Sequence, residues 1–112
     1  WLSKDMYYIL TEPIIRGIVK DLARDISPSV ISGKFHQTLI HLFADLCDVI
    51  RKETGLKRVV LSGGVFQNAL LLRGLIAALE QKNFQVFTHA IVPTNDGGIC
   101  LGQAMVAAAV AT

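Results

Sequence analysis

The sequence predicts an α/β fold that contains one strand–helix–strand unit. The short, β-branched apolar run at residues 58–61 is typical of a buried strand, and residues 84–89 are interpreted as a second strand. Between them, residues 65–81 repeat apolar side chains at helical spacing, which predicts two parallel strands joined by a helix. Two longer helical patterns precede the first strand. We therefore expect helices packed on a small parallel sheet.

Two helices are expected ahead of the first strand. The first begins at residue 12 or 13 and ends near residue 24, because Pro13 suits a first helical turn and the Thr11 side chain can cap it. The second begins at residue 29 or 30 and ends at residue 54, where the following Gly55 is typical of a helix end. Both segments carry apolar side chains at helical spacing.

A last helix is expected over residues 98–111, after a loop at residues 93–98. Its residues are small or apolar on nearly every side, which predicts close packing against other elements. The apolar stretch is shorter than the roughly 20 residues that cross a bilayer, so no membrane span is expected.

Length and composition describe one folded unit. The chain has 112 residues, of which 52% are hydrophobic and 18% charged, so it lacks the composition of a disordered tail. A chain of this length buries one core, and residues 1–112 are interpreted as a single fragment. Two buried strands do not complete a sheet alone. We therefore interpret the chain as the C-terminal segment of a larger α/β domain, whose uncovered apolar surface could also promote self-association.

Charge and cysteine content narrow the class of protein. The net charge is +2 and no run of Lys or Arg occurs, so neither nucleic acid nor a membrane surface is an expected partner. The first residues do not resemble a signal peptide. Cys47 and Cys100 each stand alone in an apolar helical pattern, which predicts two buried free thiols and a reducing, cytoplasmic location.

The residues after the first strand are the strongest candidates for a ligand site. Ser62, Gly63 and Gly64 lie between a buried strand and a helix, where missing side chains let backbone amides approach a ligand. Amides at the helix start, near residues 65–67, would favour phosphate or another anion. Asn68 could turn its amide toward a ribose or a base. The pattern alone favours this ligand site and a tight packing turn about equally.

A second candidate is Asp96, which precedes Gly97 and Gly98 in the loop after the second strand. Its carboxylate could face a cleft and bind a metal or a ligand hydroxyl. The alternative is a helix cap or first-turn acid, worth about 0.5–2 kcal/mol, and spacing alone favours this alternative. The histidines and cysteines do not show the spacing of a zinc site or a nucleophile–base pair, so no catalytic residue is assigned.

Five segments carry a resemblance to a known family: residues 33–39, 60–68, 71–73, 93–99 and 101–104. Together they closely resemble the C-terminal end of HypF, the hydrogenase-maturation carbamoyltransferase family, over roughly residues 8–111. The tRNA threonylcarbamoyl transferases and antibiotic O-carbamoyltransferases are relatives that share the two glycine motifs. The sequence motifs Phe-Gln-Asn at residues 66–68 and Asn-Asp-Gly-Gly-Ile at residues 95–99 favour the hydrogenase branch.

The resemblance implies the C-terminal lobe of an actin/hexokinase/Hsp70-like (ASKHA), Kae1-like domain. The family makes carbamoyl-adenylate from carbamoyl phosphate and ATP, and passes the carbamoyl group to the C-terminal cysteine of HypE, as a precursor of the cyanide ligands of nickel–iron hydrogenase. By this resemblance Gly63 and Gly64 would line the phosphates, with Ser62 in the same nucleotide site. Asn68 would face the nucleoside, and Asp96 would bind a divalent metal, Mg or Fe.

The resemblance covers only the end of the family's sequence. The acylphosphatase, zinc-binding and adenylate-forming domains are absent, as is the N-terminal lobe with its paired metal-binding histidines. It therefore implies that zinc and most ligands of the divalent metal lie outside this chain. The rest of its own polypeptide and a HypE-type acceptor are the expected partners, and the 112 residues alone are expected to be inactive.

Two alternatives stay open. One is an antibiotic O-carbamoyltransferase of the same superfamily, which the absence of zinc-binding cysteines upstream of this segment would favour. The other is a non-catalytic docking or dimerisation module that keeps the fold without the ligand. For that module, Asp96→Ala and Asn68→Ala would leave the ATP affinity of the complete domain unchanged.

Overall fold

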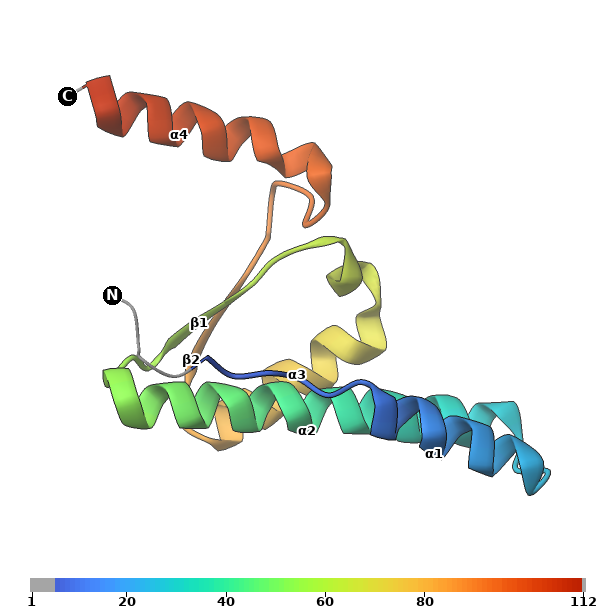
Figure 1. The fold of residues 1–112 in the computed structure, drawn as a ribbon. Coiled ribbons are helices and arrows are strands. Elements are labelled where there is room, and N and C mark those ends of the chain that lie inside the picture. Colours follow the sequence, from blue (N-terminus) through green and yellow to red (C-terminus); the bar gives the residue numbers. More distant parts are fainter. Residues whose placement is uncertain (1–5, 112) are drawn as a thin grey trace. The chain divides into compact units, whose positions relative to one another are not determined.

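The computed structural model of the chain describes residues 6–111. The elements, in order, are α1 (Glu12–Ala23), α2 (Pro28–Thr54), β1 (Arg58–Leu61), the short 3-10 helix η1 (Gly64–Gln67), α3 (Ala69–Gln81), β2 (Gln85–Thr88), the 3-10 helix η2 (Asp96–Gly98) and α4 (Ile99–Ala111) (Figure 1). The contacts divide the chain into two compact units between Thr38 and Leu39, inside α2. Each unit is described by itself.

The first unit contains α1 and the beginning of α2. Asp21 of α1 and Lys34 of α2 form an ion pair, and Ile31 is buried. The backbone carbonyl of Thr11 accepts hydrogen bonds from the first turn of α1, but the Thr11 side chain forms no capping hydrogen bond. The expected side-chain cap is therefore wrong. The φ of −83° and ψ of −23° of Thr11 are already helical, whereas a residue whose side chain caps a helix has an extended backbone.

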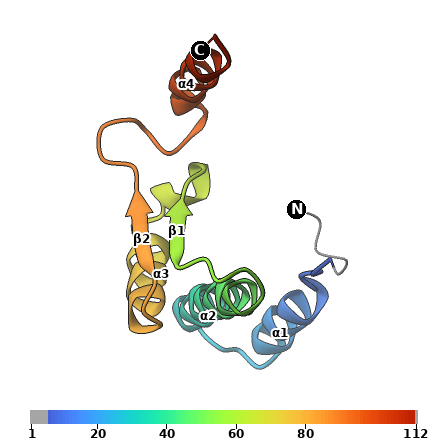
Figure 2. The same ribbon diagram turned by 90° about the vertical axis from the view of Figure 1, so that its left-hand side faces the viewer.

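The second unit is built on a parallel pair of strands joined by α3. β1 and β2 run side by side in the same direction, and Leu61 is paired with Thr88 (Figure 2). The expected α/β fold with a parallel strand–helix–strand unit is confirmed. Its core joins the second half of α2 to the strands and α3, and the buried residues are Ile40, Ala44, Leu61, Leu71, Leu75, Leu79 and Phe84.

Within its own unit, residues 39–111, the small sheet is covered on one face only. Leu61 is buried, but Val60 is 68% exposed and its register partner Phe87 is 43% exposed. Paired residues of parallel strands point to the same side of the sheet. The prediction of buried strands is therefore wrong for one face of the sheet within residues 39–111, because no element of this unit lies over the side that carries Val60 and Phe87.

α3 begins four residues later than the helix that periodicity predicts over residues 65–81. Residues 64–67 form η1 instead, and Asn68 then caps α3. Its Oδ1 atom accepts hydrogen bonds from the amides of Leu70 at 3.1 Å and Leu71 at 3.2 Å. An asparagine cap has extended dihedral angles, so it separates η1 from α3. The end of α2 at Gly55, with a φ of +74°, is as predicted.

An arginine at the end of α2 holds the end of α3. Its guanidinium lies 4.2 Å from the centre of the Phe84 ring, and Arg51 Nη1 donates to the carbonyl of Lys82. Arg51 and Lys52 also pair with Asp48, and the hydrogen bond from Arg51 is the main reason that the pKa of Asp48 lies below its usual value. Asp48 therefore belongs to a half-buried polar cluster at the end of α2.

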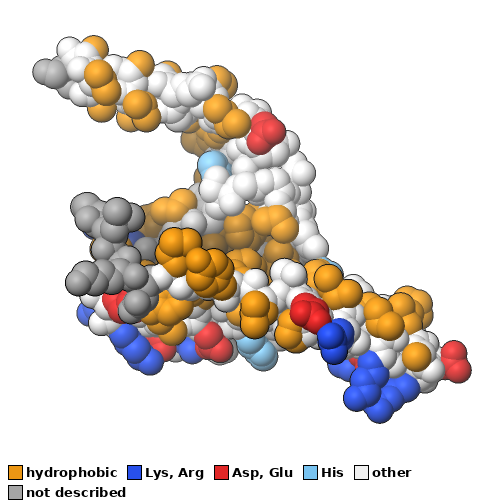
Figure 3. Space-filling view, viewed as in Figure 1, with side chains coloured by type: hydrophobic (Ala, Val, Ile, Leu, Met, Phe, Trp, Pro, Cys, Tyr) orange, Lys and Arg blue, Asp and Glu red, His pale blue; other side chains and the backbone are white. Residues whose placement is uncertain are grey.

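α4 has no buried residue, although its composition predicts close packing. Figure 3 shows hydrophobic side chains along both edges of this helix, at the top of the view. Within its own unit, residues 39–111, its neighbour along the chain is η2, and no described element of this unit covers its apolar sides. The predicted packing is therefore wrong within this chain. No helix among the described residues is long and apolar enough to cross a membrane.

The two cysteines differ in their surroundings. Cys47 in α2 is half-buried beside the core, and burial raises the pKa of its thiol. Cys100 in α4 is exposed, with its Sγ atom 3.7 Å from the carbonyl oxygen of Gly97. The prediction of two buried thiols is wrong for Cys100, for the same reason that α4 is uncovered.

Candidate functional site

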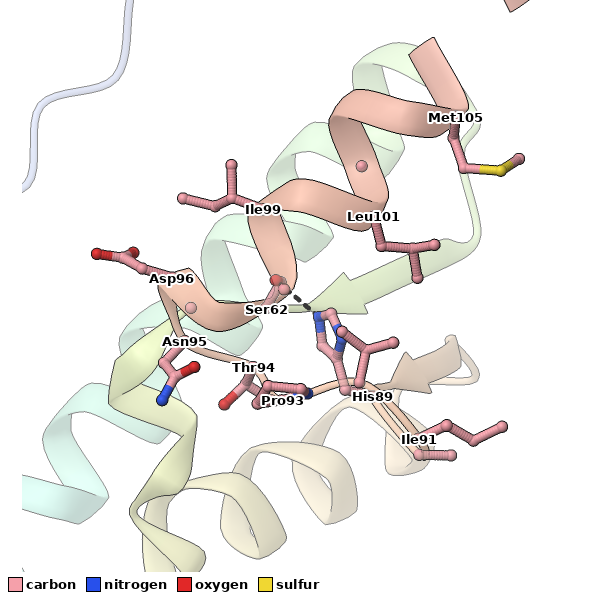
Figure 4. A pocket seen from close by; sticks show the side chains of 15 residues that line it. Ser62, His89, Ile91, Pro93, Thr94, Asn95, Asp96, Ile99, Leu101 and Met105 are labelled. Carbon is pink, nitrogen blue, oxygen red and sulfur yellow. Dashed lines mark hydrogen bonds between the residues drawn. The ribbon is translucent and has the colours of Figure 1, made fainter. Parts of the chain in front are cut away.

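The carboxyl ends of β1 and β2 lie next to each other and begin two loops. Leu61 and Thr88, the last residues of the two strands, are paired. The residues that follow them, Ser62 and His89, are therefore neighbours as well. His89 Nε2 lies 2.8 Å from Ser62 Oγ, within hydrogen-bond distance (Figure 4). In parallel α/β sheets, ligands bind outside the carboxyl ends of the strands. This edge of the sheet is therefore the place to look for a site.

A backbone hydrogen bond ties the two loops together. The amide of Gly63 donates to the carbonyl oxygen of Thr94 at 2.9 Å. Gly63 has a φ of +108°, a conformation that side-chain-bearing residues rarely adopt. A Cβ built on Gly64 would lie 3.9 Å from the Cβ of Asn95. The glycine pair thus brings the backbone after β1 against the loop after β2.

The two loops and the start of α4 line one open hollow of about 690 Å³ (Figure 4). Ser62 and Gly63 contribute from the β1 side, and Asp96 from the β2 side. Gly64 and Asn68 are not among the lining residues. Apolar side chains complete the lining, chiefly Ile91, Ile99, Leu101 and Met105. The structure therefore brings three of the five sequence-predicted site residues to one hollow.

Asp96 is the first residue of η2 and is exposed. Asn95 caps η2, since its Oδ1 atom accepts a hydrogen bond from the amide of Gly97 at 3.0 Å. The capping role considered for Asp96 thus belongs to its neighbour, and Asp96 is an acid of the first turn. In Figure 4 its carboxylate points away from Ser62 and His89. Among residues 6–111, no group of three His, Cys, Asp or Glu side chains could hold a metal ion.

The backbone amides that are available for an anion are only in part the ones that the sequence predicts near residues 65–67. The amide of Gly63 is occupied by Thr94, and the Asn68 side chain caps α3. At the start of η1, the amides of Gly64 and Val65 have no hydrogen-bond acceptor among the described residues. Two adjacent backbone donors in a turn can form an anion-binding concavity. The binding roles of Gly64 and Asn68 stay predictions.

His89 is the site residue that sequence reasoning missed. The sequence places it at the end of the predicted second strand, residues 84–89. The signal was available in part, because His89 ends the predicted second strand and Ser62 directly follows the predicted first strand. Only the strand register, with Leu61 opposite Thr88, makes the two side chains neighbours.

Comparison with known proteins decides the family. Residues 1–103 match a family described as carbamoyltransferase, Kae1-like domain, second subdomain. The chain belongs to this family. The predicted relationship to HypF and the Kae1-like fold are thereby confirmed.

Individual HypF proteins align with most of this chain. It is 36% identical over 92 residues to carbamoyltransferase HypF of Synechocystis sp., and the aligned region covers 81% of this chain and 11% of that protein. It is 38% identical over 76 residues to carbamoyltransferase HypF2 of Cupriavidus necator, and that aligned region covers 68% of this chain and 9% of that protein.

A solved structure matches more of the chain. A crystal structure of full-length HypF in a phosphate- and nucleotide-bound form superimposes with a TM-score of 0.92 and 49% identity. The match covers 97% of this chain and 14% of that one. The chain therefore spans only about a tenth of the length of the HypF proteins that it resembles.

Proposed function

We propose that this chain is the C-terminal segment of a HypF-type carbamoyltransferase and supplies one side of its nucleotide site. One observation carries the proposal: the parallel register and the Gly63–Thr94 hydrogen bond bring the loops after β1 and β2 to one hollow. The likeness to a HypF crystallised with phosphate and nucleotide supports it. The names of the relatives favour the hydrogenase branch over an O-carbamoyltransferase.

The lining of the hollow suits the two halves of a nucleotide. Ser62 supplies a hydroxyl to the hollow. The amides of Gly64 and Val65, which follow the lining residue Gly63 but are not themselves part of the lining, are donors without an acceptor among the described residues. Such donors favour a phosphate group. Ile99 and Leu101, with other apolar side chains, form a wall that could contact a base. Ligand sites of this mixed kind combine a mostly apolar lining with a few polar groups.

This chain could supply only one of the ligands of a divalent metal. Asp96 offers one exposed carboxylate at the rim of the hollow, and Mg²⁺ accepts carboxylate oxygens. The remaining ligands would come from the rest of the polypeptide, and zinc would belong to its other domains. When bound, a metal at this place would neutralise phosphate charge and polarise an acyl oxygen.

In the full-length enzyme, the proposed reaction hydrolyses carbamoyl phosphate to carbamate and inorganic phosphate, and the carbamate displaces pyrophosphate from ATP to form carbamoyl-adenylate. The carbamoyl group would then pass to the C-terminal cysteine of a HypE-type acceptor protein, and AMP would leave. In this scheme Ser62 and the η1 amides orient the phosphate that remains on AMP. Because this chain supplies one side of the site, the 112 residues alone would be inactive.

The uncovered apolar surfaces suit a segment that packs against the rest of its own polypeptide. Val60 and Phe87 on the open face of the sheet, and the whole of α4, would be covered there. Burying apolar surface stabilises by about 25 cal/mol per Å², so covering these side chains would favour the contact.

Calorimetric titration of the full-length protein with ATP and Mg²⁺ tests the proposal. Gly63→Val is expected to weaken ATP binding at least tenfold, because a β-branched residue is strained at a φ of +108° and would displace the loop. Gly17→Ala in α1 is the matched control, since a Cβ there meets nothing within 4 Å.

Mass spectrometry of a HypE-type acceptor completes the test. Wild-type protein is expected to carbamoylate the acceptor's C-terminal cysteine when ATP and carbamoyl phosphate are both present. A full-length protein that binds no ATP, or binds it equally well with Gly63→Val, would favour the docking module instead.

A further inference from the structure

The Ser62–His89 pair stands at the edge of the sheet and inside the hollow. His89 Nε2 and Ser62 Oγ are 2.8 Å apart, and both residues line the hollow (Figure 4). The pair is held by two rigid elements, because each residue directly follows a strand of the parallel ladder. The backbone thus places the two side chains within reach of each other.

The fold does not need this hydrogen bond for its stability. Both side chains are exposed, and neither belongs to the hydrophobic core. A hydrogen bond in contact with solvent adds little to stability, because water competes for both partners. A contact that is fixed in geometry but weak in stability is better explained by what it does to Ser62.

We propose that His89 is the positioning residue for Ser62 in the nucleotide site, and this inference rests on the function proposed above. A serine hydroxyl rotates freely and can donate or accept. When His89 Nε2–H donates to Ser62 Oγ, it occupies an oxygen lone pair. The hydroxyl proton of Ser62 then points into the hollow, where it can donate to a phosphoryl oxygen.

The opposite arrangement would work against an anion. If Nε2 accepted the proton of Ser62, the oxygen lone pairs of the hydroxyl would face the phosphate and repel it. A bound phosphate therefore selects the form of His89 that carries a proton on Nε2. Among the described residues that line the hollow, His89 is also the only side chain able to carry positive charge.

The charged neighbour of the pair is Asp96, and it does not compete for His89. Its carboxylate lies in η2 and points away from both Ser62 and His89 in Figure 4. His89 is therefore left to act on Ser62, and its effect on ligand binding should pass through the serine hydroxyl.

A double-mutant cycle in the full-length protein tests this inference, with the dissociation constant of ATP measured by calorimetry. Ser62→Ala and His89→Ala are each expected to weaken binding about tenfold, the size of one hydrogen bond to a charged group. The double variant is expected to be no weaker than Ser62→Ala alone, because His89 acts through Ser62. His89→Gln keeps an N–H donor and is expected to bind within about threefold of wild type.

The thermal unfolding midpoint is measured for the same four variants and is expected to match wild type. A double variant whose loss is the product of the two single losses would overturn the inference, because His89 would then act independently of Ser62. Equal weakening in His89→Gln and His89→Ala would overturn it as well.

The test separates this inference from the proposed function. If ATP binding depends on Gly63 but not on Ser62 or His89, the nucleotide site stands and the positioning role is refuted. If the wild-type protein binds no ATP, the proposed function fails and the inference falls with it.

Discussion

α3 and α4 are preceded by similar elements but differ in how they are packed. Each follows a parallel strand through a glycine-containing loop and a short 3-10 helix, and each has 13 residues. α3 buries Leu71, Leu75 and Leu79 against its own chain, whereas α4 buries no residue. Position after a strand therefore does not decide whether a helix is packed.

The difference lies in what the chain provides around each helix. α3 presents one leucine face to α2 and the strands, and a Cβ on its Gly74 would come within 2.3 Å of Ile40 Cδ1 in α2. α4 has no charged residue and no single apolar face, so it requires neighbours on several sides. We infer that the chain carries the partners of α3 and that the rest of the polypeptide carries those of α4.

The largest expected effect is in α3. Leu79 is fully buried, and Leu79→Ala is expected to destabilise the 112-residue chain by about 2–5 kcal/mol through lost contacts and a cavity. Val110→Ala in α4, where the side chain is 82% exposed, is expected to stay within about 0.5 kcal/mol. Urea unfolding measures both. Equal losses would break the comparison, because α4 would then be packed in this chain too, for instance in a self-associated form.

The next effect distinguishes the chain from the full-length protein. Val106→Asp is expected to be tolerated in the 112-residue chain, where Val106 is 65% exposed, and to cost about 1–3 kcal/mol once α4 is covered. Resistance to limited proteolysis, compared between the two proteins, reports the difference. Gln103→Glu in the same helix is the control. Tolerance of Val106→Asp in both proteins would contradict a covered α4.

A smaller effect is expected where the loop meets α4. A Cβ on Gly98 would lie 2.7 Å from the carbonyl oxygen of Pro93, so Gly98→Ala must displace the loop that lines the hollow. We expect a loss of about 1 kcal/mol and weaker ATP binding by the full-length protein. Gly102→Ala, where a Cβ meets nothing within 4 Å, is the control for stability. Equal thermal midpoints for the two variants would contradict the crowding at Gly98.

The smallest effect concerns the polar cluster that holds the end of α3. The hydrogen bond from Arg51 lowers the pKa of Asp48, so ionised Asp48 stabilises the fold above its usual pKa of about 4. That contribution is lost as the pH falls through the lowered pKa. The stability advantage of wild type over Asp48→Asn should therefore shrink between pH 6 and pH 3. An advantage independent of pH would show that the pair does not act through charge.

The sequence predicted the parts of the fold that depend on local pattern. The apolar, β-branched run at residues 58–61 and Gly55 at the end of α2 were sufficient signals. The start of α3 was not predictable by periodicity, because the apolar spacing continues through residues 65–68 while Asn68 adopts the extended cap conformation. Capping depends on one residue's dihedral angles, which the spacing of neighbours does not determine.

The site was predictable only in its outline. Glycines after one strand and Asp96 after the other indicated two loops at one edge of a parallel sheet, and Ser62, Gly63 and Asp96 do line one hollow. The Ser62–His89 pair depends on the register of the strands, which a shift of one residue would change. The exposure of α4 was not predictable, because the amino-acid pattern of a helix does not show whether its packing partners are present in the same chain.

Hydrogen exchange of the full-length protein, followed by mass spectrometry with and without ATP, tests the shared hollow most directly. Amides that a ligand covers or orders exchange more slowly. We predict slower exchange in residues 62–67 and in residues 94–98 together, with α1 unchanged as the internal reference. Protection of only one of these loops, or of neither, while ATP is bound would contradict a nucleotide site formed by both.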